Sequence, residues 1–320
     1  MKYTTITIIF VFLINTLCFS QSKIDSSQYI ESHYNKLIIS ILDESHNNSL
    51  KYKINKDELD YFTNVPSVFG VGLQYKWLRL KVNFLNGNTF RLKNKPPTDN
   101  FSFRINICSP KWVLSYLINN FNGYYLEINK NYNDQGVLDV KLNSNFINFL
   151  YYFNADKYSY KTSLFHSERQ LRSAGSIVTG FSLTHDKVDF GNDKTLSQYL
   201  NKEVNDYRNL YLTYKIGYAH TFAICKRFHI ALSAIPAISF QRGKLNFKSE
   251  EESTSRNVNF LFSTMFSLGY NTDKYFFGFD LHTRNKLYNF GDFKHLKSDL
   301  FFSMSVSRKF DLSKLKRKRK

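Results

Sequence analysis

The chain has 320 residues, with 22 Tyr and 31 Phe but only 13 Gly and 5 Pro, and its net charge is +18. Beyond the first twenty residues, no apolar run approaches the roughly 20 residues that a spanning helix needs, which excludes a helical membrane protein. A basic chain can bind nucleic acid or anionic lipid. The export predicted below argues against nucleic acid, and the joint abundance of Asn, Lys, Ile, Tyr and Phe is also typical of an AT-rich genome.

Residues 1–20 have the parts of a secretory signal peptide. Lys2 precedes an apolar run from Ile6 to Leu17, and Ser20 offers a small residue for cleavage. Residues 15–17 lack the small side chains of a lipoprotein site, so we do not expect lipid on Cys18. Lys2 is the only charged residue in this segment, so the exported chain would carry +17.

Residues 21–64 are polar and mixed in pattern, and they predict a periplasmic lead-in. Ile38 to Leu42 and Tyr52 to Ile54 are possible first strands of a barrel wall. After cleavage two cysteines remain, Cys108 and Cys225. They could form a disulfide in an oxidising compartment, but two distant cysteines without a partner motif more often stay free and buried.

Residues 65–310 alternate with period two, as strands with unlike faces do. Leu300, Phe302, Met304 and Val306, for example, alternate with small polar residues. The runs are about 10–14 residues long, which suits the ~25 Å apolar band of an outer-membrane barrel better than the shorter strands of soluble sheets. We therefore predict an all-β fold, a closed antiparallel transmembrane up-and-down β-barrel of about 12 strands. A soluble exported β protein is the alternative.

Two long polar connections, residues 86–100 and 187–206, separate the runs. Strict up-and-down alternation places them at opposite ends of the barrel. One hairpin is then miscounted, or one periplasmic connection is long. The basic segment 311–320 is predicted to be a solvated periplasmic tail.

The polar faces of the predicted strands carry charges that a barrel would turn toward its lumen. An internal ion-pair network would plug the lumen, whereas a ring of cations would attract anions through it. We favour a plugged or narrow lumen. The candidate lumen-lining residues are Arg79, Lys81, Arg104, Lys161, Lys215, Lys274, Asp280, His282, Asp299 and Lys309.

The densest polar cluster lies at residues 166–176. His166, Ser167 and Glu168 invite a lipid-hydrolase interpretation, but neighbours along a strand point to opposite faces and cannot form a triad. The preferred interpretation is a turn closed by Glu168 with Arg169 or Arg172, in which Gly175 allows a close backbone approach. The network candidates are Glu168, Arg169, Arg172, Ser173, Gly175 and Ser176. No motif for catalysis, metal or cofactor binding is present.

Several short motifs, in order, resemble a known family. They are the segments around Tyr75-Lys76-Trp77, Gly123-Tyr124-Tyr125-Leu126, Glu168-Arg169-Gln170 and Ser173-Ala174-Gly175-Ser176. Together they resemble the domain of unknown function 4421, a family of exported Bacteroidetes proteins with a predicted outer-membrane barrel. The resemblance extends from about Ser27 to Phe310. It implies an outer-membrane location and a barrel, and it implies no catalytic residues and no cofactor.

These observations predict a non-enzymatic outer-membrane barrel that is structural or a narrow, anion-leaning, porin-like pore. Its expected partners are outer-membrane lipid and lipopolysaccharide, and the barrel-assembly machinery during insertion. An outer-membrane barrel enzyme acting on lipid is the alternative function. The oligomeric state does not follow from the sequence.

Overall fold

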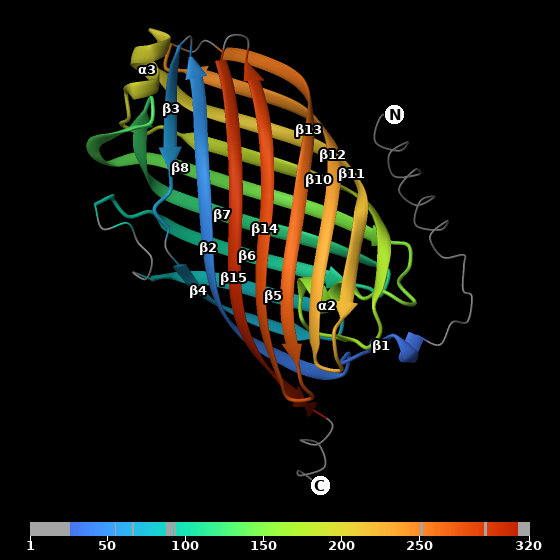
Figure 1. Ribbon diagram of the computed structural model, residues 1–320. Helices are drawn as coiled ribbons and strands as arrows, with labels where there is room; N and C mark the ends of the chain where they lie inside the picture. The colour runs from blue at the N-terminus through green and yellow to red at the C-terminus, as the bar shows by residue number, and fades with distance from the viewer. Residues whose placement is uncertain are drawn as a thin grey trace.

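The computed structural model describes residues 26–312, except 55, 66, 88–91, 93, 250–251 and 291–292. The predicted signal peptide and residues 313–320 of the tail lie outside this range. Twelve strands close into an antiparallel barrel, as predicted (Figure 1). They are β2 (Lys36–Ile54), β4 (Ser67–Tyr75), β5 (Leu78–Gly87), β6 (Asp99–Cys108), β7 (Trp112–Ile128), β8 (Asn131–Tyr152), β10 (Ala174–Asp189), β11 (Val204–Ala223), β12 (Phe228–Phe247), β13 (Glu252–Asn271), β14 (Tyr275–Phe290) and β15 (Phe293–Asp311).

Six shorter elements complete the described chain. In chain order they are η1 (Ser26–Gln28), β1 (Ile30–Glu31), β3 (Asp57–Phe62), α2 (Tyr160–Leu164), β9 (Arg169–Gln170) and α3 (Thr195–Leu200), which lies in the β10–β11 connection. No helix among the described residues is long and apolar enough to cross a membrane.

The wall begins earlier than the sequence predicted. β2 pairs with β15 over its whole length, from Lys36 to Ile54, and so closes the barrel. The predicted boundary of the barrel at residue 65 is therefore wrong, and the possible first strands, Ile38 to Leu42 and Tyr52 to Ile54, both lie in β2. β2 escaped clear recognition because apolar residues occupy both of its faces, with Ile39 and Ile41 exposed and Leu50 and Tyr52 buried.

Between β2 and β7, the wall has three strands at one end of the barrel and one strand at the other. β2 pairs with β4 at one end and with β3 at the other. β3 then pairs directly with β7, whereas the β5–β6 hairpin separates β4 from β7. Two hydrogen bonds stabilise the point where β3 and β4 diverge. Asn64 Nδ2 donates to Lys95 O at 2.8 Å, and Thr98 Oγ1 donates to Gly123 O at 2.6 Å. Gly123 has a φ of 90°, which a residue with a Cβ rarely adopts.

We call the end that carries β1 and the last residues of β15 the terminal end, and the opposite end the loop end (Figure 1). The two long connections predicted from the sequence follow β5 and β10, which run in the same direction, so both point toward the loop end. The extra long connection is at the terminal end, where residues 153–173 join β8 to β10. Of the two explanations offered above, a miscounted hairpin therefore applies, because the even number of strands between the two connections, β6, β7, β8 and β10, returns the chain to the same end.

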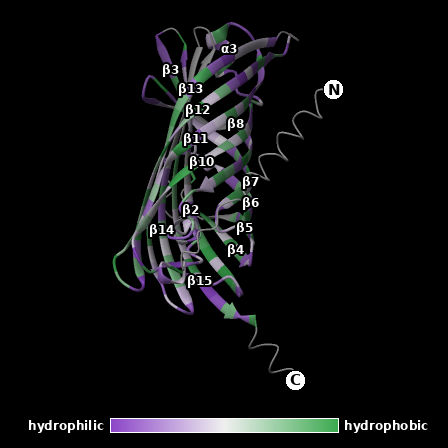
Figure 2. Ribbon diagram, turned by 90° about the vertical axis from the view of Figure 1, so that its right-hand side faces the viewer, coloured by the Kyte–Doolittle hydropathy of each residue, from purple (hydrophilic) through white to green (hydrophobic). Residues whose placement is uncertain are grey.

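Toward the terminal end the barrel carries apolar residues outside and polar residues inside. On β15, Met304 and Val306 are about half exposed, whereas Ser303 and Ser305 are buried. Figure 2 shows hydrophobic and hydrophilic residues alternating along the wall strands. The predicted outward apolar face is thus present, in the arrangement that suits a lipid-facing wall.

The arrangement reverses toward the loop end, and β8 shows both states. In the half of β8 that lies toward the terminal end, Ile147 faces outward and is 43% exposed, while Asn148 faces the lumen. Near its loop-end half, Lys141 is exposed outside and Leu142 is fully buried inside. We call the first region the belt half and the second the loop half. The loop half has the polarity of a soluble protein, so the apolar belt covers only part of the wall.

Candidate functional site

Residues 153–173 fold back into the belt half of the lumen, and we call this segment the plug. Its helix α2 begins with Tyr160, whose hydroxyl donates to Ser109 O at 2.6 Å and to Trp112 O at 2.9 Å. The Tyr160 ring stacks on Tyr152, with 4.7 Å between centroids. A buried tyrosine needs a partner for its hydroxyl, and here the β6–β7 turn provides it. The plug is thereby fixed to one side of the wall.

The tip of the plug reaches opposite sides of the lumen. Phe165 O accepts a 2.6 Å hydrogen bond from Arg79 on β5. His166 lies 2.9 Å from the Asp280 carboxylate on β14, through Nε2, and stacks on Phe276. A Cβ on Gly278 would lie 2.7 Å from the His166 ring, so only glycine lets the tip approach this closely. The plug therefore crosses the lumen and is bonded on both sides.

Glu168 organises the plug from within. Its carboxylate accepts a 2.6 Å hydrogen bond from Ser159 Oγ and pairs with Lys161 Nζ at 3.3 Å. Its backbone carbonyl accepts from Asn271 Nδ2 at 2.8 Å. The predicted pair with Arg169 or Arg172 is not formed among the described residues. Lys161, predicted as a wall residue of the lumen, instead lies on α2 and serves this network.

Arg169 and Gln170 fasten the plug to the terminal end. Arg169 bonds Glu31 at 2.7 Å and Asp273 at 2.8 Å, through different nitrogens. The hydrogen bond and charge of Arg169 lower the pKa of Asp273. Gln170 Oε1 accepts from Ser159 N at 3.0 Å, and its Nε2 donates to Lys157 O at 2.6 Å. β9 also pairs with β1, so the N-terminal segment holds the plug in place.

The remaining network candidates tie the two ends of the plug to β11 and β10. Ser173 Oγ accepts from Ala223 N at 3.0 Å, and Ser176 Oγ accepts from Asn154 N at 3.0 Å. A Cβ on Gly175 would lie 2.1 Å from the Tyr218 hydroxyl, which is the close approach that the sequence suggested. Arg172 is exposed and lies over the Tyr29 ring. All six candidates are thus gathered around the plug, with partners that the sequence did not indicate.

We call the ion pairs of Arg169 with Glu31 and Asp273 the latch. His33 is buried within range of the charges of Arg169 and Asp273. Burial is the main cause that lowers its pKa to about 3, and the charges of Lys309, Lys36 and Arg169 add to it. Lys309 itself turns inward and donates to Thr272 O at 2.7 Å. His33 is therefore neutral in the folded protein at neutral pH.

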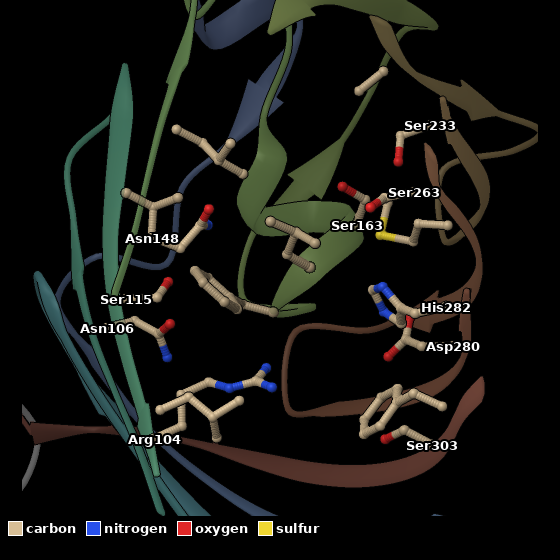
Figure 3. A pocket seen from close by; sticks show the side chains of 18 of the residues that line it. Arg104, Asn106, Ser115, Asn148, Ser163, Ser233, Ser263, Asp280, His282 and Ser303 are labelled. Carbon is tan, nitrogen blue, oxygen red and sulfur yellow. The ribbon is translucent and has the colours of Figure 1, made fainter. Parts of the chain in front are cut away.

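Above the plug lies a luminal cavity of about 240 Å³. Arg104, Asn106 and Asn148 enter it from one side, and His282, Asp280 and Ser303 from the other (Figure 3). The predicted lumen candidates that line it are Arg79, Lys81, Arg104, Lys215, Asp280 and His282. Lys274 does not, because it is exposed next to the β13–β14 turn. The side chain of Asp299 lies outside the described part of the structure.

The cavity has an excess of positive charge. Four basic side chains and the carboxylates of Glu44 and Asp280 line it, which gives a formal charge of +2 with neutral histidines. Glu44 is 1% exposed and accepts from Lys81, Asn83 and Ser303. Lys215 Nζ donates to Asn148 Oδ1 at 2.6 Å. Buried cations raise the local affinity for an anion, since desolvated charges interact more strongly than charges in water.

The loop half of the lumen is filled in another way. Tyr52, Tyr61 and Phe190 pack with ring centroids 5.6–6.2 Å apart. Tyr61 donates to Asp193 Oδ2 at 2.7 Å, and Leu196 of α3 packs on the same apolar core. This core takes its side chains from β2, β3, β7, β8 and β10–β12. Side chains of the wall, joined by Phe190 and Leu196 from the β10–β11 connection, occupy this end.

Sequence reasoning missed the His166–Asp280 contact and the plug itself. These two residues are 114 positions apart in the sequence, which leaves no spacing pattern to read. No serine hydroxyl bonds His166 Nδ1 in the described structure, so no triad is present there. Likewise, the described residues contain no group of three His, Cys, Asp or Glu side chains suited to hold a metal. Cys108 is buried and Cys225 exposed, and both are free.

Comparison with solved structures shows barrels of low similarity. The outer-membrane protease OmpT of Escherichia coli is 8% identical, with a TM-score of 0.42, over 87% of this chain and 98% of that chain. The toluene transporter TodX of P. putida is 7% identical, with a TM-score of 0.31, over 86% and 90%. Ail, the attachment invasion locus protein of Yersinia pestis, is 8% identical, with a TM-score of 0.26, over 86% and 99%. We draw no functional argument from similarities this low.

No curated protein has a similar sequence. The family model described as a domain of unknown function, DUF4421, matches residues 23–310. That range includes the whole barrel wall but for its last residue, together with the plug and β1. The resemblance noted in the sequence is thereby confirmed, and the chain belongs to the DUF4421 family.

Proposed function

We propose that this protein is a non-enzymatic outer-membrane barrel that is closed to free diffusion and holds a small anion in its lumen. The outward apolar belt and the expected signal peptide support the location. Separation of membranes, followed by gel mobility with and without heating, tests it. A folded barrel in unheated detergent migrates differently from the heated chain, whereas recovery in the soluble periplasmic fraction would support the soluble alternative.

The observation that carries the proposal is the positively charged cavity between the plug and the loop-half core. Its volume of about 240 Å³ is well above the ~10–15 Å³ that a single water molecule needs, which leaves room for a phosphate, a sulfate or a small carboxylate. Rings of basic side chains favour anions. Entry would require displacement of the plug, because both ends of the lumen are occupied.

The two other candidate functions have less support. An open anion pore would need a continuous passage, and the plug and the loop-half core both stand in its way. A lipid hydrolase would have only the His166–Asp280 contact in its favour. A His–carboxylate pair needs a nucleophile within hydrogen-bond reach of the other imidazole nitrogen. The pair also faces the lumen and not the lipid-facing surface.

Calorimetric titration of the purified full chain with inorganic phosphate tests the anion site. We expect measurable binding that falls at least about tenfold in the Arg104→Gln/Lys215→Gln variant, since two charge-assisted contacts are lost. The Lys53→Gln/Lys130→Gln variant removes two exposed lysines and should bind like the wild type. Equal binding by both variants, or no binding of phosphate by the wild type, would contradict the proposal.

A further inference from the structure

The outer wall carries a group of cations where the apolar belt ends on β10–β13. On β12 and β13, Arg242 and Arg256 are directly opposite each other. Both are exposed on the outer face, and the next outward residues toward the terminal end are Phe240 and Val258. One step farther toward the loop end, the register aligns Lys187, Arg208 and Lys244 on β10, β11 and β12. The cations therefore form two adjacent rows along the edge of the belt.

The two rows differ in their carboxylate partners. The row nearer the loop end is paired with acids: Lys187 with Asp189, Arg208 with Asp206, and Lys244 with Glu252. Among the described residues, no carboxylate pairs with Arg242 or Arg256. Like charges directly opposite on a sheet destabilise it, with about 4.5–5.5 Å between Cβ atoms. An anion bound between the two guanidinium groups would remove that repulsion.

An apolar groove lies on the same strands, on the terminal-end side of the arginines. Its volume is about 560 Å³, and its lining includes Ile216, Pro236, Ile238 and Phe260. Proline has no N–H to donate to the neighbouring strand. The ladder between β11 and β12 is accordingly interrupted at Pro236, between the pair Lys215–Ala237 and the pair Tyr218–Ala234. From Arg242 to Ile238 the strand rises about 13 Å, at ~3.3 Å per residue.

Two cations beside an apolar groove match a lipid, which has an anionic head group next to an acyl chain. We propose that Arg242 and Arg256 bind a phosphate of lipid A, the lipid portion of lipopolysaccharide, and that one of its acyl chains lies in the groove. Guanidinium groups suit this role because they bind phosphate through two parallel hydrogen bonds. The loop end faces outward in a barrel whose termini are periplasmic, which places this edge at the outer leaflet. The inference rests on the proposed outer-membrane location, but not on the luminal anion site.

Native mass spectrometry of the purified full chain in detergent tests the site, with bisphosphorylated lipid A as the probe. We expect a bound lipid, and an affinity at least about tenfold lower for the Arg242→Gln/Arg256→Gln variant. The Arg242→Lys/Arg256→Lys variant keeps the charges but loses the forked geometry, so its affinity should be intermediate. The Lys226→Gln/Arg227→Gln variant removes two exposed cations in the β11–β12 turn, at the other end of β12, and should bind normally.

Each variant is first checked for heat-modifiable mobility, so that loss of binding is separated from loss of folding. Equal affinity of the wild type and the Arg242→Gln/Arg256→Gln variant would overturn the proposal. Equal retention of phosphatidylglycerol, which carries one phosphate, would overturn the choice of lipid A. Neither result depends on phosphate binding in the lumen or on cell fractionation, so this inference and the proposed function can fail separately.

Discussion

The belt half and the loop half of the barrel are built from the same strands but have opposite polarity: apolar residues face outward in the first and inward in the second. In the belt half, Ile147 and Met304 face outward, and Asn148 and Ser303 face the lumen. In the loop half, Lys141 faces outward and Leu142 and Tyr207 are buried inside. A polar lumen needs hydrogen-bonding partners, and the plug provides them, whereas an apolar lumen closes on its own side chains. The belt half is therefore filled mainly by one inserted segment, and the loop half mainly by the side chains of its own strands.

The largest expected effect is in the loop-half core. Tyr61→Ala removes a fully buried ring and the hydrogen bond to Asp193, and should lower the free energy of unfolding by about 3–5 kcal/mol. Reversible urea unfolding in detergent measures it. Tyr34→Ala, at a side chain 46% exposed, is the matched control and should change little. A loss below about 1 kcal/mol for Tyr61→Ala would mean that the loop half does not depend on its core.

A charge placed on the outer face should separate the two halves directly. Phe262→Arg, in the middle of the belt on β13, should cost about 2–4 kcal/mol in lipid vesicles, because the charge meets hydrocarbon. Thr254→Arg lies on the same face of the same strand in the loop half and should cost far less. Folding equilibria in vesicles measure both. Similar costs at the two positions would show that the belt does not end where the polarity reverses.

The latch of the plug should have a smaller and more local effect. Arg169→Ala removes the bonds to Glu31 and Asp273 and should weaken the plug by about 1–3 kcal/mol. The measurement is hydrogen exchange of plug amides such as Ser167 N, which bonds Lys161 O. Arg172→Ala removes an exposed arginine of the same segment and is the control. Unchanged exchange in Arg169→Ala would contradict the role of the latch.

The smallest effect is a dependence on pH through His33. Its pKa is about 3 in the folded chain and near 6.5 when unfolded, so the unfolded state binds more protons between these values. The contribution to stability is complete above about pH 6.5 and falls as pH decreases, by at most about 1.4 kcal/mol per pH unit. Urea unfolding at pH 7 and pH 5 should show this loss in the wild type and in His185→Gln, but a reduced loss in His33→Gln. Identical losses in all three would exclude His33 as the source.

The same reversal of polarity explains which strands could be predicted from the sequence and which could not. Strands within the belt half, such as Leu300 to Val306, alternate clearly and predicted the barrel. β2 was placed mostly in the lead-in because its loop-half residues Leu50 and Tyr52 point inward while Ile39 and Ile41 point outward. A pattern that assigns every apolar residue to lipid cannot recognise such a strand.

The site was only partly predictable for a related reason. Arg79, Lys81 and Arg104 follow strand alternation, so their position in the lumen could be expected. Lys161 and His166 lie on the plug, and their partners Glu168 and Asp280 are fixed by the way the plug folds back. The family motif around Glu168-Arg169-Gln170 marked the important segment, but the identity of its partners depends on contacts with β1, β13 and β14.

Single-channel recording of the full chain in a planar bilayer tests the central claim most directly, namely that both ends of the lumen are closed. The account predicts no steady open-channel steps at moderate voltage, at either polarity, from protein whose insertion is verified by heat-modifiable mobility. Steady, ohmic, anion-selective steps from the unmodified chain would contradict it.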